Sequence, residues 1–176
     1  MDLIKRIVLD FDGLNEYYAT IVTAIDSKPE LSDYKMNARY NIVSDVYNCL
    51  EFWLVELCSM RKTKISYKQI KAKNELAKLN KYLLKEVGLN LTEVKSNYDQ
   101  LQSLRSVRNC VVHNGAHVKS NELDNIPGIK THGVYLGNEN KNITLVCVTD
   151  AFIEISIENA KLYLTHVATS LTKLST

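Results

Sequence analysis

Apolar residues recur every three or four positions along the first third of the chain, which is the spacing of an amphipathic helix. The first such segment covers residues 4–25 and should end at Ser27-Lys28-Pro29, because the residue before a proline avoids helical geometry. The second covers residues 36–61, and its apolar positions alternate steps of four and three, as in a helix packed lengthwise in a bundle. The chain is therefore expected to begin with two long helices.

Capping residues mark the helices that follow. A third helix is expected over residues 66–87, with Gly88 in the position of a C-cap. Asn90 or Thr92 then caps a fourth helix. This helix should stop at Asn114-Gly115, because both residue types tolerate a left-handed backbone.

The pattern changes between residues 115 and 150. Short alternating runs at residues 134–136 and 143–146 are separated by a cluster of turn residues, which predicts a small hairpin or extended excursion. Thr149 or Asp150 then caps a final amphipathic helix. The insertion thus comes directly before the last helix.

Length and composition agree with one helical domain. The 176 residues fit a single domain over residues 1–176, and 6 glycines and 2 prolines are few for a β-sandwich with many turns. The predicted fold class is all-α: an up-and-down helical bundle of about five helices with a small β-hairpin or extended insertion before the last helix.

Charge and cysteine content narrow the function classes. A net charge of +2 argues against a dedicated nucleic-acid coat, but it leaves room for a local basic site. The 4 cysteines have no zinc-binding spacing, so reduced thiols packed in a core are expected. The sequence contains no signal-peptide pattern and no long uncharged apolar run. We therefore expect a cytoplasmic protein with no membrane partner.

Arg108 is the anomaly of the fourth helix. With 100° per residue and Leu101 at zero, Leu104, Val111 and Val94 fall in an apolar arc between about 280° and 20°. Arg108 falls at about 340°, in the middle of this arc. A permanently charged guanidinium there needs a partner, since burying an unpaired charge is costly. The structural alternative is a buried salt bridge that holds the bundle together.

His113 lies off the apolar arc, at about 120°. It follows Arg105 and Asn109 at steps of four, and Asn114-Gly115 comes directly after it. On an ideal helix about 140° separate Arg108 from His113. The two side chains can therefore meet only if the helix end distorts or if a second chain supplies another copy. This geometry favours a site shared across a dimer axis; the alternative is that His113 is an ordinary polar residue at a helix end.

The segment Arg108-Asn109-x-x-x-His113, followed by Asn114-Gly115, resembles the R-x(4–6)-H signature of the HEPN superfamily. The strict match covers about ten residues, and the order of the expected helices extends the likeness over most of the chain. The resemblance implies a metal-independent endoribonuclease that acts on RNA as a homodimer, often in toxin–antitoxin or phage-defence systems with a cognate antitoxin protein. It also implies that the arginine and histidine of both protomers face each other in one cleft.

The chemistry of these side chains fits RNA cleavage without a metal. In that reaction the 2′-hydroxyl attacks the adjacent phosphorus and leaves a 2′,3′-cyclic phosphate and a 5′-hydroxyl. The imidazole of His113 can take or give the proton. Arg108 offers paired donors to the phosphate oxygens, and Asn109 would orient the histidine or bind the phosphate. Arg105 is a candidate for binding flanking phosphates, with a solvated charge as the equal alternative.

Two further assignments complete the expected site. Glu51, on the edge of the second helix, would reach Arg108 across the bundle and fix its orientation, and a solvent-facing glutamate is the alternative. No metal is expected, because Gly115 interrupts the helix between His113 and His117. No cofactor is expected either, and the sequence has no Gly-rich phosphate loop. The rival function is a non-catalytic HEPN-like dimerisation or adaptor module that keeps the motif for structure or ligand binding.

Overall fold

The computed structural model describes residues 2–126, 128–140 and 142–174. Within these ranges the chain forms five α-helices: α1 (Leu3–Asp26), α2 (Tyr34–Ser59), α3 (Glu75–Lys85), α4 (Lys95–Asn114) and α5 (Asp150–Lys173). Short 3-10 turns lie at Pro29–Leu31, Tyr67–Gln69, Thr92–Val94 and Leu123–Asn125. The expected helical bundle is confirmed.

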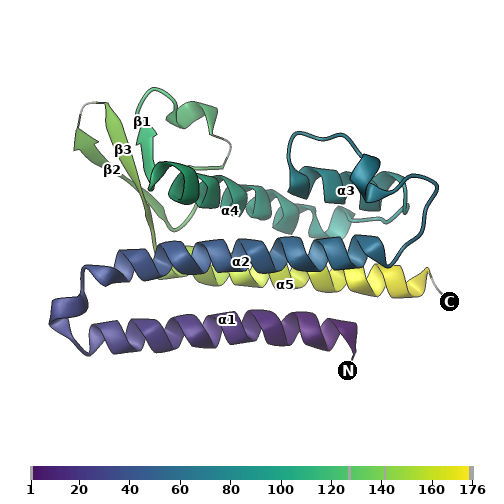
Figure 1. The fold of residues 1–176 in the computed structure, drawn as a ribbon, viewed down its shortest axis with the longest axis horizontal. Helices are drawn as coiled ribbons and strands as arrows, with labels where there is room; N and C mark the ends of the chain where they lie inside the picture. Colours follow the sequence, from purple (N-terminus) through teal and green to yellow (C-terminus); the bar gives the residue numbers. More distant parts are fainter. Residues whose placement is uncertain (1, 127, 141, 175–176) are drawn as a thin grey trace.

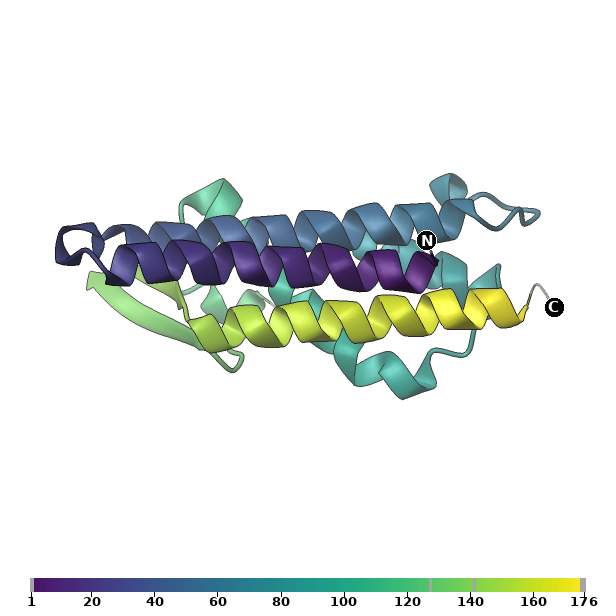
Figure 2. The same ribbon diagram turned by 90° about the horizontal axis from the view of Figure 1, so that it is seen from below.

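The helices pack in layers along the long axis of the molecule. α2 and α5 lie side by side between α1 on one side and α4 on the other (Figure 1 and Figure 2). Leu50 and Leu54 of α2 and Ile153 and Leu164 of α5 are completely buried, so the core runs along this middle layer. α3 lies near the first turns of α4, and a small sheet lies beyond the last turn of α4 (Figure 1). α4 therefore connects two structurally different ends of the molecule.

The insertion before α5 is a three-stranded antiparallel sheet. Its strands are β1 (His117–Lys119), β2 (Val134–Asn140) and β3 (Ile143–Val148), in the order β1-β3-β2. The runs at 134–136 and 143–146 are confirmed as β2 and β3, and β3 alternates between half-buried and buried positions as period two requires.

The all-α class is not exact, because the insertion is a three-stranded sheet that includes a strand the sequence pattern did not indicate. Gly115 and Ala116 both have positive φ, of 57° and 67°, which turns the chain sharply after α4. The next three residues then pair with β3, with Val118 opposite Thr144. A strand of three residues is too short to show period-two alternation in a sequence.

The third helix is shorter than expected and begins only at Glu75. Asn74 has an extended backbone, and its side chain accepts a hydrogen bond from the backbone N–H of Ala77 at 2.8 Å. Ser66 starts a separate 3-10 turn with its own capping box. Two N-caps in succession therefore divide a stretch whose apolar spacing alone suggested one helix.

The expected end of the first helix and the expected start of the last agree with the structure. Ser27 ends α1, and Thr149 caps α5 by accepting from the backbone N–H of Phe152 at 3.4 Å.

The fourth helix differs: α4 begins only at Lys95, its N-cap residue is Val94, and no side chain of the described chain caps it. The expected cap by Asn90 or Thr92 is therefore wrong. Asn90 accepts instead from the N–H of Thr92 at 3.0 Å, in the 3-10 turn that precedes α4. Side-chain capping thus marks the starts of α1, α3 and α5, but not those of α2 and α4.

Three helices are joined by a polar cluster at one end of the bundle. Arg39 of α2 donates two hydrogen bonds to the Asp150 carboxylate of α5, at 2.8 and 3.0 Å. The Tyr18 hydroxyl of α1 donates to the same carboxylate at 2.5 Å. We call these three residues the clasp.

All four cysteines are free, and Cys58 and Cys110 are buried. Burial raises the pKa of the Cys110 thiol to about 11.

In the described part of the chain, no helix has both the length and the apolar character needed to cross a bilayer.

Candidate functional site

α4 carries four of the five residues expected in the site. Arg105, Arg108, Asn109 and His113 all lie on it, and the helix stays regular through Asn114. Gly115 then ends it in the left-handed conformation that the sequence predicted. The helix end therefore does not unwind to bring His113 round to Arg108. Among the described residues, no hydrogen bond joins the two side chains.

Arg108 is half-buried between α4 and α2. Its guanidinium carbon lies 5.5 Å from the centroid of the Tyr47 ring, within the range of a cation–π contact. Nη1 donates to Asn109 Oδ1 at 3.2 Å, while Nε is shielded from solvent and has no hydrogen-bond partner in the described structure. The ring and the neighbouring amide thus hold a cation that the sequence placed in an apolar arc.

Tyr47 is the site residue that sequence reasoning missed. Its hydroxyl donates to Glu51 Oε1 at 2.7 Å, one helical turn further along α2, and its side chain is only 3% exposed. Burial raises the pKa of Tyr47, and the hydrogen bond to Glu51 raises it further, against the opposing charges of Arg105 and Arg108. The signal was the Tyr-x-x-x-Glu spacing on α2, but Tyr47 also occupies a core position of the apolar pattern.

Glu51 contacts Tyr47 rather than Arg108. Across the described ranges, none of the ion pairs within 4.0 Å involves Glu51, Arg105 or Arg108. The carboxylate is therefore linked to the guanidinium only through the tyrosine ring. This arrangement leaves the positive charge of Arg108 without a neutralising partner at bonding distance.

His113 and Arg105 lie at the surface of the same helix. His113 is exposed and has solvent access for proton exchange, and Arg105 is half-buried. The positive charge of Arg105 acts on Tyr47 and also on Tyr98, two turns earlier on α4. α4 thus carries two guanidinium groups on the side of Tyr47 and an exposed imidazole on another side, and these groups are suited to binding and protonating a phosphodiester.

No group of three or more His, Cys, Asp or Glu side chains in the described part of the chain is arranged to hold a metal ion. Comparison with known proteins gave no match to a family model, a curated protein or a solved structure.

Proposed function

We propose that two copies of this chain form a metal-independent endoribonuclease, with Arg108 and His113 as the catalytic pair. The observation that carries the proposal is the state of Arg108. Its guanidinium rests on the Tyr47 ring and on Asn109, with no carboxylate bonded to it among the described residues. A cation held in this way keeps its charge and part of its donor set for a phosphate.

Two copies are needed because the helix remains regular. About 140° separate Arg108 from His113 on one helix, so a single α4 directs them to different sides. A second α4 related by a two-fold axis would place its His113 beside the first Arg108. Val112, next to His113, is 47% exposed and offers apolar surface for such a contact.

In the proposed reaction one His113 accepts the proton of the 2′-hydroxyl. The resulting O2′ forms a bond to phosphorus while the bond between phosphorus and O5′ breaks. A protonated imidazole, which the second copy supplies, gives its proton to the departing O5′. Arg108 donates to the non-bridging oxygens as their negative charge increases. The products are a 2′,3′-cyclic phosphate and a 5′-hydroxyl.

The neighbouring residues have supporting roles in this proposal. Asn109 accepts from Arg108 through Oδ1, so it orients the guanidinium, and its amide N–H groups remain for the phosphate. Glu51 fixes the Tyr47 hydroxyl and thereby the ring that supports Arg108. Arg105 binds a flanking phosphate.

A digestion assay tests the catalytic assignment. Purified protein should degrade single-stranded RNA in the presence of EDTA and leave 2′,3′-cyclic phosphate ends. His113→Ala and Arg108→Ala should each lower the rate by at least about 100-fold. His132→Ala is the matched control, because His132 is exposed and lies outside the site. Undiminished cleavage by His113→Ala would contradict the assignment.

The resemblance to HEPN proteins also suggests a biological role as a toxin or phage-defence effector. A toxin or phage-defence effector, held in check by a cognate antitoxin, should slow growth when it is expressed alone. Arg108→Ala should remove that effect at equal protein level. Equal growth of the two strains would argue against a toxin and leave regulated cleavage as the remaining role.

The half-burial of Arg108 against Tyr47 favours a second candidate, a non-catalytic dimerisation or adaptor module. In that case Arg108 packs the bundle and meets no substrate. The protein would then form a dimer without cleaving RNA, and Arg108→Ala would lower stability alone. The digestion assay separates the two functions.

A further inference from the structure

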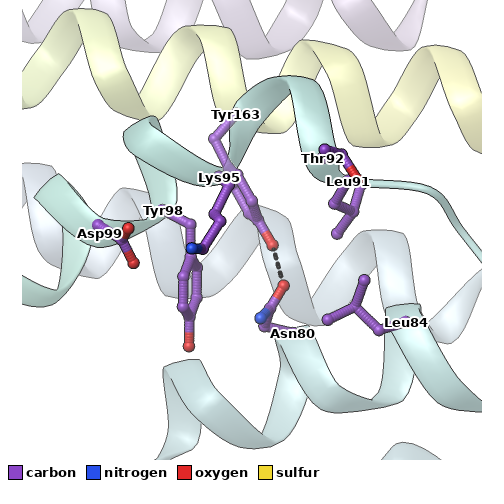
Figure 3. Close-up of a pocket in the computed structure, with 8 residues that line it drawn as sticks. All are labelled: Asn80, Leu84, Leu91, Thr92, Lys95, Tyr98, Asp99 and Tyr163. Carbon is purple, nitrogen blue, oxygen red and sulfur yellow. Dashed lines mark hydrogen bonds between the residues drawn. The ribbon is translucent and has the colours of Figure 1, made fainter.

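A pocket of about 260 Å³ lies at the first turns of α4, where α3 and α5 meet it. Figure 3 shows Tyr98 and Lys95 on one side of this pocket and Leu84 and Leu91 on the other. The volume is below the roughly 300–1,000 Å³ typical of drug-sized ligands, and it suits a single flat ring system. The walls are aliphatic and aromatic, so such a ring would be held by stacking and apolar contact.

Polar groups converge on the floor of the pocket. The buried Tyr163 hydroxyl donates to Asn80 Oδ1 at 2.7 Å, as the dashed line in Figure 3 marks. This bond occupies Asn80 Oδ1, so the amide nitrogen of Asn80 lies on the side of Tyr98, where it interacts with the Tyr98 hydroxyl. An amide nitrogen has two N–H donors, so one remains for a ligand. The Tyr98 and Tyr163 rings pack with their centroids 5.8 Å apart. A ligand therefore meets a fixed ring and a fixed amide.

One stripe of α4 connects this pocket to the candidate site. Tyr98, Gln102, Arg105 and Asn109 follow one another at steps of four, three and four, and all four are half-buried. Arg105 lies between the two ends, since its charge acts on Tyr98 on one side and on Tyr47 on the other. At 1.5 Å per residue, Tyr98 and Arg108 are about 15 Å apart along the helix, a span of a few nucleotides.

The charged residues at the rim of the pocket favour a phosphate outside it and an uncharged base inside it. Lys95 is exposed at the rim and forms no ion pair within the described ranges, so it can meet a phosphate. Asp99 lies one turn further at the same rim, and its carboxylate disfavours a phosphate inside the pocket itself. The interior thus suits an uncharged ring, with the charged backbone outside.

We propose that this pocket binds one unpaired base of a single-stranded RNA whose backbone follows α4, past Arg105, to Arg108 and His113. This inference rests on the proposed ribonuclease function and names its substrate class. The base stacks on Tyr98 and bonds to the Asn80 amide, and Lys95 and Arg105 meet the flanking phosphates. A base inside a duplex is paired and stacked, so double-stranded RNA cannot occupy the pocket.

Two variants test the pocket without removing the catalytic pair. Tyr98→Leu keeps apolar volume and removes the stacking ring. Asn80→Asp keeps the acceptor for the Tyr163 hydroxyl and removes the amide donors. Tyr17→Leu is the matched control, because Tyr17 is 55% exposed on α1, which lies on the opposite side of the middle layer. Circular dichroism checks that each variant folds, and Asn80→Asp carries the test if Tyr98→Leu does not fold.

The probe is a seven-nucleotide RNA with 2-aminopurine placed at each position in turn, titrated into the His113→Ala variant in EDTA. One position should lose fluorescence through stacking on Tyr98. Tyr98→Leu should restore that fluorescence and weaken binding about tenfold, and Asn80→Asp should weaken binding several-fold. Tyr17→Leu should change neither. Equal quenching at all positions, or equal affinity for a duplex of the same sequence, would overturn the inference.

The outcomes distinguish this inference from the proposed function. Wild type that cleaves RNA with a KM unchanged by Tyr98→Leu and Asn80→Asp refutes the pocket assignment alone. Wild type that cleaves nothing, while the quenching at one position depends on Tyr98, refutes the nuclease and retains the pocket as an RNA-base site. A raised KM with a nearly unchanged kcat in both variants supports both.

Discussion

At the scale of residues, the site depends on what holds Arg108. A carboxylate would neutralise the guanidinium, whereas the Tyr47 ring stabilises the charge and leaves it in place. Glu51 acts one step away, through the tyrosine hydroxyl. The pairing of cation and ring therefore explains how a charged group occupies a half-buried position and remains available to an anion.

A double-mutant cycle measures this pairing independently of any activity. Tyr47→Leu and Arg108→Gln, alone and together, should show a coupling in the free energy of unfolding of about 0.5–2 kcal/mol, because each single change removes the same cation–π contact. Urea denaturation followed by circular dichroism gives the four values. Tyr47→Phe keeps the ring and the contact, so a cycle built on Tyr47→Phe and Arg108→Gln should show nearly additive effects, with a coupling close to zero. Additive effects of Tyr47→Leu and Arg108→Gln would show that the contact contributes nothing.

The sequence alone identified the two unusual side chains of α4 but not what surrounds them. Arg108 and His113 could be singled out because helical geometry assigns each an angle from its position. Tyr47 could not, since its contact with Arg108 joins two helices far apart in the sequence and depends on their packing. The same limit applies to Asn80 and Tyr163, which meet only when α3 and α5 are in place.

At the scale of elements, Gly133 allows the sheet to meet α5. It precedes β2 with φ 79°, and a Cβ there would lie 2.7 Å from the backbone nitrogen of Phe152. Its carbonyl also accepts hydrogen bonds from the N–H and the hydroxyl of Thr149. The close approach therefore requires a residue without a side chain.

Gly133→Ala and Gly88→Ala form a matched pair that separates backbone strain from steric clash. Both glycines have φ 79°, but no atom lies within 4 Å of a Cβ at Gly88. Gly88→Ala should lower the free energy of unfolding by about 1 kcal/mol, the cost of a left-handed alanine. Gly133→Ala should cost about 3 kcal/mol, because Phe152 must also move. Chemical denaturation provides the comparison, and equal losses would argue against the clash.

The clasp predicts how the bundle responds to acid. The hydrogen bonds from Arg39 lower the pKa of Asp150 below its ordinary value of 3.8, so the stabilisation is complete above that value and is lost as the pH falls through the lower, folded pKa. Asp150→Asn should cost about 1 kcal/mol at neutral pH, a modest effect because the carboxylate is 41% exposed to screening water. As the pH falls from 3.8 through the lower pKa of folded Asp150, the stabilities of wild type and variant should converge in urea denaturation. A difference that persists below that pKa would exclude the ion pair as its source.

Elements differed in how well their sequence signals predicted them. Long helices such as α1 and α5 repeat their apolar spacing over many turns, and their caps are local. The prediction that residues 66–74 belong to the third helix was wrong, because Asn74 caps the start of α3 within a continuous apolar pattern. β1 could not be predicted, because its three residues form a strand only by pairing with β3, which lies more than twenty residues away in the sequence.

At the scale of the whole molecule, α4 is the element on which the proposed activity is arranged. α2 and α5, which form the middle layer, pack against one side of α4. The first turns of α4 lie near α3 and the pocket, and its last turn lies near the sheet (Figure 1). His113 is exposed on the surface of α4, Arg105 is half-buried there, and Arg108 lies half-buried between α4 and α2. A second copy that approaches along this surface would complete the site and leave the pocket open at its far end.

Complementation between two inactive variants tests whether the site is shared between copies. Arg108→Ala and His113→Ala should each be inactive alone, and each should sediment as a dimer at micromolar concentration. After the two are mixed and allowed to exchange subunits, a mixed dimer carries one intact Arg108 and one intact His113 on different copies. The proposed site draws Arg108 and His113 from opposite chains, so the mixed dimer keeps one Arg108 beside one His113. Water must then protonate the departing O5′ in place of the missing second imidazole, so RNA cleavage in EDTA should return only in part. Mixing His113→Ala with an Arg108→Ala, His113→Ala double variant is the control and should restore nothing. If the first mixture also remains inactive while subunit exchange is demonstrated, the two residues do not act across a dimer axis.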